Sequence, residues 1–229
     1  MKEQTFKNYY LGRSNTAAYD FLLASILFPG HVMNPLYIYG DSGVGKTHLL
    51  RAVQDTPNHL IPARRTVYTT ARELCDELVK SIQAGEICRM FENRFRDADI
   101  VMIDDVQYIA KKNATQAEIA GILVALCDRN QQVILACDRP LEEFPILYLR
   151  MRTRSKSLKK VRIHLPDRTL RKKLIWKKAE ALGLTISNET ASDILKKSYT
   201  SLAIDGALNE LKLRRDMNGG CLTMKRMTE

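Results

Sequence analysis

Residues 40–47 read Gly40-Asp41-Ser42-Gly43-Val44-Gly45-Lys46-Thr47, which fills every position of the phosphate-binding P-loop pattern, and they come directly after the apolar residues 36–39. A loop that leaves a buried strand and enters a helix points its backbone N–H groups at a phosphate. In such a loop Lys46 reaches the β- and γ-phosphates and the Thr47 hydroxyl can hold Mg²⁺. The alternative is a glycine-rich turn with a chance Lys-Thr pair, but residues 47–53 continue as a helix-forming sequence. The stretch therefore predicts the strand–loop–helix start of a nucleotide-binding α/β domain.

A second apolar stretch ends in two acidic residues, which is the other half expected of such a site. Residues 100–103 read Ile-Val-Met-Ile and are followed by Asp104 and Asp105. Asp104 would hold the magnesium ion, directly or through water, and Asp105 is placed to orient or deprotonate the water that attacks the γ-phosphate. Strands often end in Asp-rich turns, so it is the pairing with the P-loop that gives this motif its meaning.

Composition indicates an ordered, cytoplasmic protein. The chain has 229 residues with 45% hydrophobic content, enough to fill a core. No apolar run reaches the roughly 18 residues that cross a bilayer, and residues 1–5 lack an apolar export stretch. We therefore expect a cytoplasmic location and no membrane partner.

Cysteine and histidine spacing gives no sign of a protein-bound transition metal. The five cysteines are odd in number and lack any C-x-x-C spacing, so we expect reduced, mostly buried thiols. The four histidines share no ligand spacing. Mg²⁺ bound with the nucleotide is the only metal implied. These residues are Cys75, Cys88, Cys127, Cys137, Cys221, His31, His48, His59 and His164.

The charge balance favours a polyanionic partner. Thirty-six Lys and Arg against 26 Asp and Glu give a formal net charge of +10. The excess is concentrated after Leu149, in residues 150–160 and 171–173. Such a balance most often marks contact with nucleic acid, the alternative being a basic surface without a ligand.

Apolar periodicity predicts alternating strands and helices, and hence a mostly parallel sheet covered on both faces. We expect strands over 36–39, 66–70, 100–103, 132–136 and 160–164. Helices are expected over 17–27, 47–54, 71–84, 86–94 and 114–129, with a short turn over 141–152. From Arg168 onward the pattern is only helical, with breaks at Gly183, near Ser187 and at Thr200, and Ser187 is typical of a helix start. We predict a core over 1–165 and a small all-helical lid over 166–229.

Four segments together resemble a known family. Residues 5–15, 34–40, 45–50 and 103–108 are similar to the AAA+ ATPase domain of DnaA, the bacterial replication initiator. The resemblance covers nearly the whole chain and implies a five-stranded AAA+ sheet that binds ATP with Mg²⁺. The residues that it implies around the nucleotide are Tyr10, Leu11 and Asn15 beside the adenine and Gly40, Asp41, Ser42, Gly43, Val44, Gly45, Lys46, Thr47 and His48 at the P-loop.

The resemblance implies two further catalytic positions. Asp138, after the fourth strand, matches the sensor I position, where a polar group touches the γ-phosphate or the attacking water. Arg154 matches the arginine finger that reaches the ATP site of a neighbouring subunit. The next four residues, Ser155-Lys156-Ser157-Leu158, depart from the family's aromatic and glycine residues, and a solvated basic surface is the alternative for these arginines.

Residues 71–94 resemble the initiator-specific helix pair, which in the family lines a channel for single-stranded DNA. Val79 and Lys112 fall at positions that would contact the strand. Ala114 stands where the family has an arginine, so we expect weakened binding of single strands.

The lid departs from the family at the sensor II position, where Leu202 replaces an arginine. An uncharged side chain cannot contact the γ-phosphate, so we expect looser coupling between lid and nucleotide. Glu229 falls where the family's last lid helix begins, and no helix-turn-helix module comes after it in this sequence. We therefore expect a shortened lid.

The sequence is thus interpreted as a DnaA-like AAA+ ATPase that binds ATP·Mg²⁺ between Lys46, Thr47 and Asp104 and hydrolyses it slowly. Its role would be replication initiation or its control, through self-assembly, contact with single-stranded DNA, or docking on DnaA or the replicative helicase. Two alternatives stay open: a helicase loader of the neighbouring family, and a degenerate paralogue that holds nucleotide and acts only by docking. Leu202 and the altered stretch after Arg154 favour the paralogue, and the intact Asp104-Asp105 pair opposes it.

Overall fold

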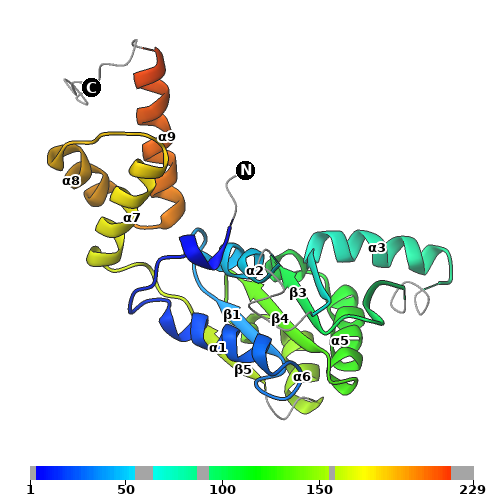
Figure 1. Cartoon of the computed structure of the whole chain (residues 1–229). Coiled ribbons are helices and arrows are strands. Elements are labelled where there is room, and N and C mark those ends of the chain that lie inside the picture. Colours follow the sequence, from blue (N-terminus) through cyan, green and yellow to red (C-terminus); the bar gives the residue numbers. More distant parts are fainter. Residues whose placement is uncertain (1–3, 55–63, 87–92, 155–157, 218–229) are drawn as a thin grey trace.

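The computed structural model describes residues 4–54, 64–86, 93–154 and 158–217 (Figure 1). Five strands form one sheet in the order β2-β3-β4-β1-β5, with every neighbouring pair parallel, which confirms the predicted α/β fold. The strands are β1 (Leu36–Tyr39), β2 (Thr66–Thr70), β3 (Ile100–Asp104), β4 (Gln132–Cys137) and β5 (Lys159–Arg162). The last strand begins one residue earlier than expected and ends two residues earlier.

Helices cover both faces of the sheet, as expected from the alternation of elements. They are α1 (Thr16–Leu27), α2 (Lys46–Gln54), α3 (Ala71–Gln83), α5 (Asn113–Asp128) and α6 (Pro145–Arg154), with short 3₁₀ turns η1 (Phe6–Asn8), η2 (Val106–Ile109) and η3 (Leu141–Glu143). The helix expected over 86–94 lies mostly outside the described residues.

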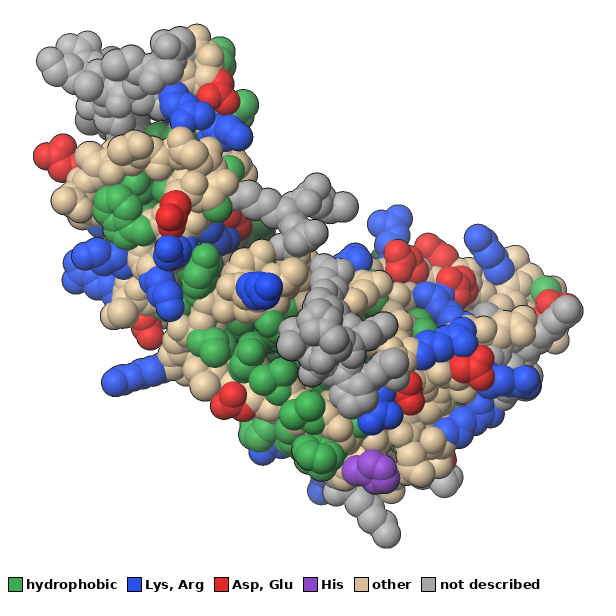
Figure 2. All heavy atoms as spheres, in the orientation of Figure 1, with side chains coloured by type: hydrophobic (Ala, Val, Ile, Leu, Met, Phe, Trp, Pro, Cys, Tyr) green, Lys and Arg blue, Asp and Glu red, His purple; other side chains and the backbone are tan. Residues whose placement is uncertain are grey.

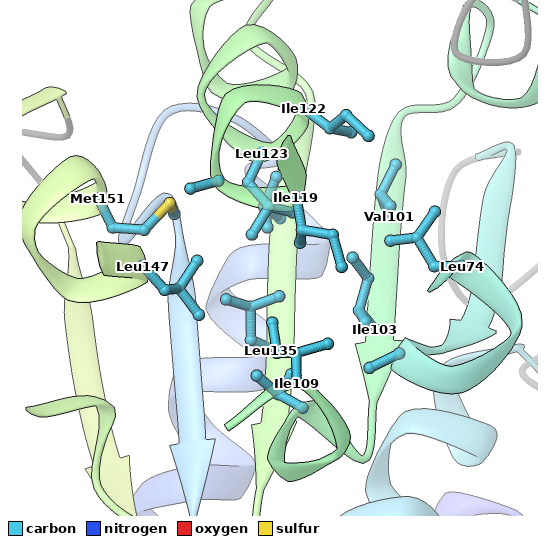
Figure 3. Close-up of a cluster of buried hydrophobic side chains, with 14 of the residues drawn as sticks. Leu74, Val101, Ile103, Ile109, Ile119, Ile122, Leu123, Leu135, Leu147 and Met151 are labelled. Carbon is cyan, nitrogen blue, oxygen red and sulfur yellow. The ribbon is translucent and has the colours of Figure 1, made fainter. Parts of the chain in front are cut away.

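Successive residues of each strand point to opposite faces, and this divides the core into two layers. Val101 and Ile103 of β3 pack with α3, α5 and α6, whereas Ile100 and Met102 pack with α1 and α2. Figure 3 shows side chains of α5 and α6 pointing onto β3 and β4 in the first layer. Because both faces are buried, the central strands read as continuous apolar runs.

One sequence expectation in this region was wrong. Residues 141–152 do not form a short turn, because η3 is followed by the ten-residue helix α6. Leu147 and Met151, four positions apart, are both fully buried against the sheet. Pro145 opens the helix, where its missing N–H leaves no helical hydrogen bond unmade. The apolar spacing, read together with Pro145, indicates a helix.

The remaining described residues form three helices, α7 (Arg168–Ala181), α8 (Asn188–Lys197) and α9 (Ser201–Met217), around an apolar core of their own. Their breaks fall at the predicted residues. The Ser187 hydroxyl accepts a hydrogen bond from the Thr190 N–H at 3.1 Å, which confirms the predicted helix start. Figure 1 shows these helices standing beyond one end of the sheet. The boundary between residues 165 and 166 stays a prediction.

Cys75, Cys127 and Cys137 are free thiols, and the first and last of them are buried. Cys88, Cys221 and His59 lie outside the described residues. Among the helices that the structure describes, none is both long enough and apolar enough to cross a membrane.

Candidate nucleotide site

Three functional segments meet at one edge of the sheet because the strands that carry them are parallel neighbours. β1 leads into the P-loop, β4 lies beside it and leads to Asp138, and β3 lies beside β4 and ends at Asp104. Burial lowers the pKa of Lys46, and the negative charges of Asp104 and Asp138 oppose this effect. The structure therefore places the P-loop lysine in the field of both predicted acidic residues.

Lys46 lies inside the loop that precedes it. Its side chain is only 8% exposed, and its ammonium donates hydrogen bonds to the carbonyl oxygens of Gly40 at 2.6 Å and Asp41 at 2.9 Å. A buried ammonium needs such acceptors. Phosphate oxygens entering the loop would compete with these two carbonyls for hydrogen bonds from the Lys46 ammonium. Because phosphate oxygens are charged, their hydrogen bonds to the ammonium are stronger than those of the carbonyls.

Two glycines of the loop are required by close approach. Gly43 has a φ of +77°, and a Cβ there would lie 2.7 Å from the Cβ of Leu202. Gly45 has a φ of +108°, and a Cβ there would lie 3.1 Å from the ring of Tyr9. The loop is thus packed between the N-terminal segment and the first turn of α9.

The two acidic residues after β3 point in different directions. Asp104 is 1% exposed, and its Oδ2 accepts from the Tyr68 hydroxyl at 3.0 Å while its Oδ1 accepts from the Asp105 N–H at 2.9 Å. Asp105 has left-handed backbone angles, φ 54° and ψ 43°, and is exposed. Its Oδ1 accepts from the Gln107 amide at 2.9 Å. The left-handed residue turns one carboxylate outward and leaves the other buried.

The oxygen donors at this edge suit Mg²⁺ bound together with a nucleotide. Among the described residues, no three His, Cys, Asp or Glu side chains gather into a metal site. Magnesium is usually held by one or two protein oxygens together with phosphates and water. The exposed Thr47 hydroxyl and the Asp104 carboxylate, which keeps free lone pairs beyond its two hydrogen bonds, fit that role.

A cavity of about 870 Å³ lies between the P-loop side of the core and the lid. The core contributes the segment before α1 and the start of α2, and the lid contributes α7 and α9. Its charged lining is mostly basic, with Arg51, Lys177 and Lys178 against Asp205. The size falls within the usual range for ligand sites, and the charge suits an anion.

The predicted nucleotide residues divide into those that line this cavity and those that do not. Tyr10, Asn15, Val44, Gly45, Thr47 and His48 line it. Gly40, Asp41, Ser42, Gly43 and Lys46 do not, and they form the neighbouring turn of the loop instead. Leu11 is 40% exposed and lies outside the cavity lining. The cavity therefore adjoins the part of the loop that enters α2.

Asn15 shapes the N-terminal segment with its side-chain amide. Its Oδ1 accepts from the Gly12 N–H at 2.8 Å, and its Nδ2 donates to the Tyr10 carbonyl at 3.0 Å. Residue 12 has no room for a side chain, since a Cβ there would lie 2.9 Å from Leu170 of α7. Asn15 thus fixes the N-terminal segment that packs against α7 of the lid beside the cavity.

His48 ties α2 to the same segment. Its Nε2 lies 3.0 Å from the Thr5 carbonyl oxygen and 2.8 Å from the Asn8 Oδ1, and its ring meets the edge of the Tyr9 ring. Burial lowers the pKa of His48, which the Thr5 carbonyl opposes. The environment of His48 therefore disfavours the charged imidazolium.

The structure also locates the other predicted catalytic positions. Asp138 is partly buried at the end of β4, and its Oδ1 accepts from the Arg139 Nε at 2.8 Å. Arg154 is the last residue of α6, and its side chain lies outside the described part of the chain. Leu202 is 63% exposed in the first turn of α9, directly over Gly43. The lid thus presents an aliphatic side chain to the P-loop at the predicted sensor II position.

The residues predicted for single-stranded DNA lie on a separate surface. Val79 is 52% exposed on α3, and Lys112 and Ala114 are exposed around the start of α5. The Lys112 ammonium lies 3.7 Å from the centre of the Tyr108 ring. This aromatic contact orients the lysine.

Sequence reasoning missed two side chains of the nucleotide site. Arg51 lines the cavity one helical turn after Thr47, and a search at i+4 spacing along α2 would have found it. Tyr68 lies on β2, and its hydroxyl reaches Asp104 because β2 pairs with β3. The Arg51 guanidinium lies 4.0 Å from the centre of the Tyr68 ring, which links the cavity to the buried carboxylate. No local pattern in the sequence marks Tyr68.

The parallel sheet with its P-loop after β1, its acidic pair after β3 and its helical lid defines a AAA+ nucleotide-binding domain. Comparison with known proteins narrows the class. The sequence profile of the family described as the bacterial DnaA ATPase domain matches residues 1–159. The chain therefore belongs to the DnaA ATPase domain family.

Individual relatives agree with this family. The chromosomal replication initiator DnaA of Symbiobacterium thermophilum is 33% identical over 208 residues, covering 90% of this chain and 45% of that protein. DnaA of Thermoanaerobacter sp. strain X514 is 35% identical over 205 residues, covering 89% of this chain and 46% of that protein. This chain spans about half the length of the curated relatives that it matches.

Solved structures of DnaA show the same fold. Domain III of DnaA from Thermotoga maritima matches with a TM-score of 0.87 and 27% identity, over 97% of this chain and 93% of that one. DnaA bound to AMPPCP and single-stranded DNA matches with a TM-score of 0.81 and 28% identity, over 96% of this chain and 69% of that one.

Tyr68→Phe should weaken divalent-cation binding about 10-fold while leaving metal-free nucleotide binding unchanged. Removing the hydroxyl takes away the donor that orients the Asp104 carboxylate, and such outer partners typically change metal affinity by about 10- to 100-fold. The measurement is Mn²⁺ titration by electron paramagnetic resonance with a non-hydrolysable ATP analogue.

Tyr37→Phe is the matched control, because the Tyr37 hydroxyl likewise donates one hydrogen bond, to the Arg139 carbonyl at 2.9 Å. Each of the two variants loses one hydroxyl hydrogen bond, so we expect similar losses of folding stability. Only Tyr68→Phe should change Mn²⁺ affinity. Equal Mn²⁺ affinity in both variants would contradict the role assigned to Tyr68.

Proposed function

We propose that this chain binds ATP·Mg²⁺ at the P-loop edge of the sheet, hydrolyses ATP slowly, and acts in bacterial DNA replication initiation or its regulation. It would do so in the cytoplasm, through ATP-dependent assembly and contact with single-stranded DNA. The observation that carries the proposal is the buried Lys46 ammonium, held in a P-loop beside Asp104 and Asp138. The basic cavity beside the loop supports the proposal as well, because it offers space for the rest of an anionic nucleotide.

Each side chain has a chemical task in this proposal. The backbone N–H groups of residues 42–47 and the Lys46 ammonium balance phosphate charge, and Thr47 and Asp104 would hold Mg²⁺, which supplies Lewis-acid stabilisation of that charge when bound. Asp105, exposed and turned outward, would orient a water molecule or accept its proton through the carboxylate oxygen that Gln107 does not contact. Asp138 would contact the γ-phosphate or the same water.

Two features support slow turnover. The Gln107 amide already donates to Asp105, so this hydrogen bond competes with one from the attacking water. Leu202 brings no charge to the loop at the sensor II position. The Leu202 contact also favours a second candidate, a nucleotide-holding paralogue that acts by docking onto DnaA or the replicative helicase. Steady-state ATPase measured with and without single-stranded DNA separates the two, because only the enzyme turns over.

Lys46→Ala should abolish measurable ATP binding, whereas Asp105→Asn should spare binding and slow hydrolysis. Losing a desolvated, charge-assisted contact weakens binding by about 2–4 kcal/mol. Asp105 lies outside the loop and acts on Lys46 less than Asp104 and Asp138 do, so its change should affect mainly the attacking water. Fluorescent ATP titration and single-turnover hydrolysis measure the two steps. Unchanged ATP affinity in the Lys46 variant would refute the site.

Arg154→Ala should leave ATP binding by the monomer intact and remove ATP-dependent assembly. An arginine supplied to a neighbour's γ-phosphate acts only across the subunit boundary. Arg152→Ala, two residues earlier on α6, is the matched control and should assemble normally. Ultracentrifugation with a non-hydrolysable analogue gives the result. A wild type that stays monomeric with ATP at high concentration would make residues 150–160 a solvated or DNA-facing surface instead.

Lys112→Glu should weaken binding of single-stranded DNA more than Lys196→Glu does. Lys112 lies on the proposed strand surface beside Tyr108, whereas Lys196 is exposed on α8. Both changes alter net charge equally, so a difference reports position. Affinity should depend on salt with a slope of about 0.7 per neutralised phosphate and show no sequence preference. Equal losses in the two variants would remove Lys112 from the strand surface.

A further inference from the structure

Helix α7 carries more positive charge than its packing explains. Six of its 14 residues are Lys or Arg, and Glu180 is its one acidic residue. Arg168, Lys172, Lys173 and Trp176 are all exposed on its outer side. We call this set the α7 basic face. Lys and Arg side chains gather on the part of the lid where Figure 1 places α7 (Figure 2).

The other cations of α7 already have partners inside the lid. The Arg171 guanidinium donates to the carbonyls of Leu195 at 3.0 Å and Ser198 at 3.2 Å, and the Lys178 ammonium donates to Ser201 and Asp205. Lys177 pairs with Glu180. Contacts within the lid therefore explain three of the six cations, namely Arg171, Lys177 and Lys178.

The cations of the basic face have no acidic partner among the described residues. Lys173 lies 5.7 Å from the centre of the Tyr10 ring, and Arg168 and Lys172 form no ion pair in this part of the chain. Their charge is therefore available to an outside anion.

Helix electrostatics disfavours this arrangement. Arg168 lies in the first turn of α7, at the positive end of the helix dipole, where the acidic side chain is that of the N-cap Asp167, whose carboxylate accepts from the Leu170 N–H at 2.8 Å. Arg168 with Lys172, and Lys173 with Lys177, are like charges four positions apart, which repel on a helix surface. The attraction of a polyanion bound to this face would offset these unfavourable terms.

We propose that the α7 basic face binds the phosphate backbone of duplex DNA, at a site separate from the Val79 and Lys112 surface. Arg168 and Lys172 lie one helical turn apart, about 6 Å along the axis, and can engage neighbouring phosphates of one strand. Trp176 lies one turn further in the same line and is 36% exposed, so it can pack on the sugar edge. Contacts of this kind carry no sequence information.

The shape of the face selects duplex over single strands and over membranes. A single strand needs a groove with stacking platforms, whereas these cations project from the outer side of a helix. A helix that lies in a membrane inserts a broad apolar side, but Leu170, Leu174, Ile175 and Ala179 of α7 are all buried in the lid core. A rod-like polyanion with dense, regular charge remains as the fitting partner.

This site is independent of the proposed nucleotide and single-strand sites. Figure 1 places α3 and α7 at opposite ends of the molecule, so one change cannot reach both surfaces. Arg168, Lys172 and Trp176 do not line the 870 Å³ cavity. Failure of the α7 proposal would therefore leave ATP binding and single-strand binding as they are.

The test compares two double variants of the full chain that change net charge equally. Arg168→Glu with Lys172→Glu removes the basic face, and Lys196→Glu with Lys197→Glu on α8 is the matched control. Only the first should weaken duplex binding, by at least 10-fold at low salt. It should also lower the slope of log affinity against log salt by about 2, since each phosphate contact contributes about 0.9.

A second readout separates binding from folding. The α7 variant should melt at about the same temperature as wild type, because glutamate at position 168 suits the first turn of a helix while positions 168 and 172 only exchange one like-charge pair for another. The conservative pair Arg168→Lys with Lys172→Arg should keep duplex affinity. The α7 glutamate variant and the conservative pair should both bind ATP with the affinity of wild type.

Three outcomes would overturn the proposal. Equal loss of duplex binding in the α7 and α8 variants would mean that only net charge matters. Loss of binding to vesicles containing anionic lipid, with duplex binding unchanged, would assign the face to a membrane. Loss of duplex binding together with a lower melting temperature, and no recovery in the conservative pair, would make the face part of the fold.

Discussion

The pairing of β1 with β4 on one side and β5 on the other is the constraint on which the site depends. With β4 placed between β1 and β3, the loops after these strands open at one edge, and residues far apart in the sequence share one electrostatic environment. The three central strands β1, β3 and β4 are buried on both faces, so a slip in register would move apolar side chains from one core layer to the other. The packing of two apolar layers thereby fixes the positions of Lys46, Asp104 and Asp138 without any direct bond between them.

Burial of Lys46 then sets the chemistry of that edge. Desolvation disfavours its charge, and two loop carbonyls with two nearby carboxylates restore it. Such an ammonium is a strong site for an anion, because a phosphate adds attraction without further loss of solvation for the lysine. Asp104 is arranged by the same logic, since a carboxylate that is 1% exposed must accept hydrogen bonds, and Tyr68 and the Asp105 N–H supply them.

Local patterns in the sequence predicted the elements that local physics determines. The apolar runs predicted all five strands, and Ser187 predicted a helix start because a cap involves residues only three positions apart. The P-loop pattern placed Lys46 correctly within a strand–loop–helix unit. The short turn predicted over 141–152 was wrong, because Leu147 and Met151 have helical spacing and pack on the sheet from α6. The roles assigned to the site residues remain predictions.

Contacts between distant segments are the part that the sequence could not supply. Tyr68 meets Asp104 only because β2 pairs with β3, and Gly12 must be small only because Leu170 of α7 lies against it. Neither relation leaves a periodic or local signal. A local resemblance can also select too many residues. Tyr10 and Leu11 both lie in the segment that resembles the family, but only Tyr10 lines the cavity.

The lid shows how one domain separates two electrostatic tasks. Toward the core, the P-loop meets Leu202 of α9 and the preceding Thr200, whereas Lys177 and Lys178 of α7 line the cavity beside it. Both lysines also pair with acidic residues of the lid, so the charge that the lid turns toward the cavity is partly balanced within the lid itself. Toward solvent, α7 keeps cations that its own dipole and its neighbouring charges disfavour. Arg168 and Lys172 lie outside the cavity lining, so nucleotide binding does not explain their positive charge. The proposed duplex site on the outer side of α7 explains it.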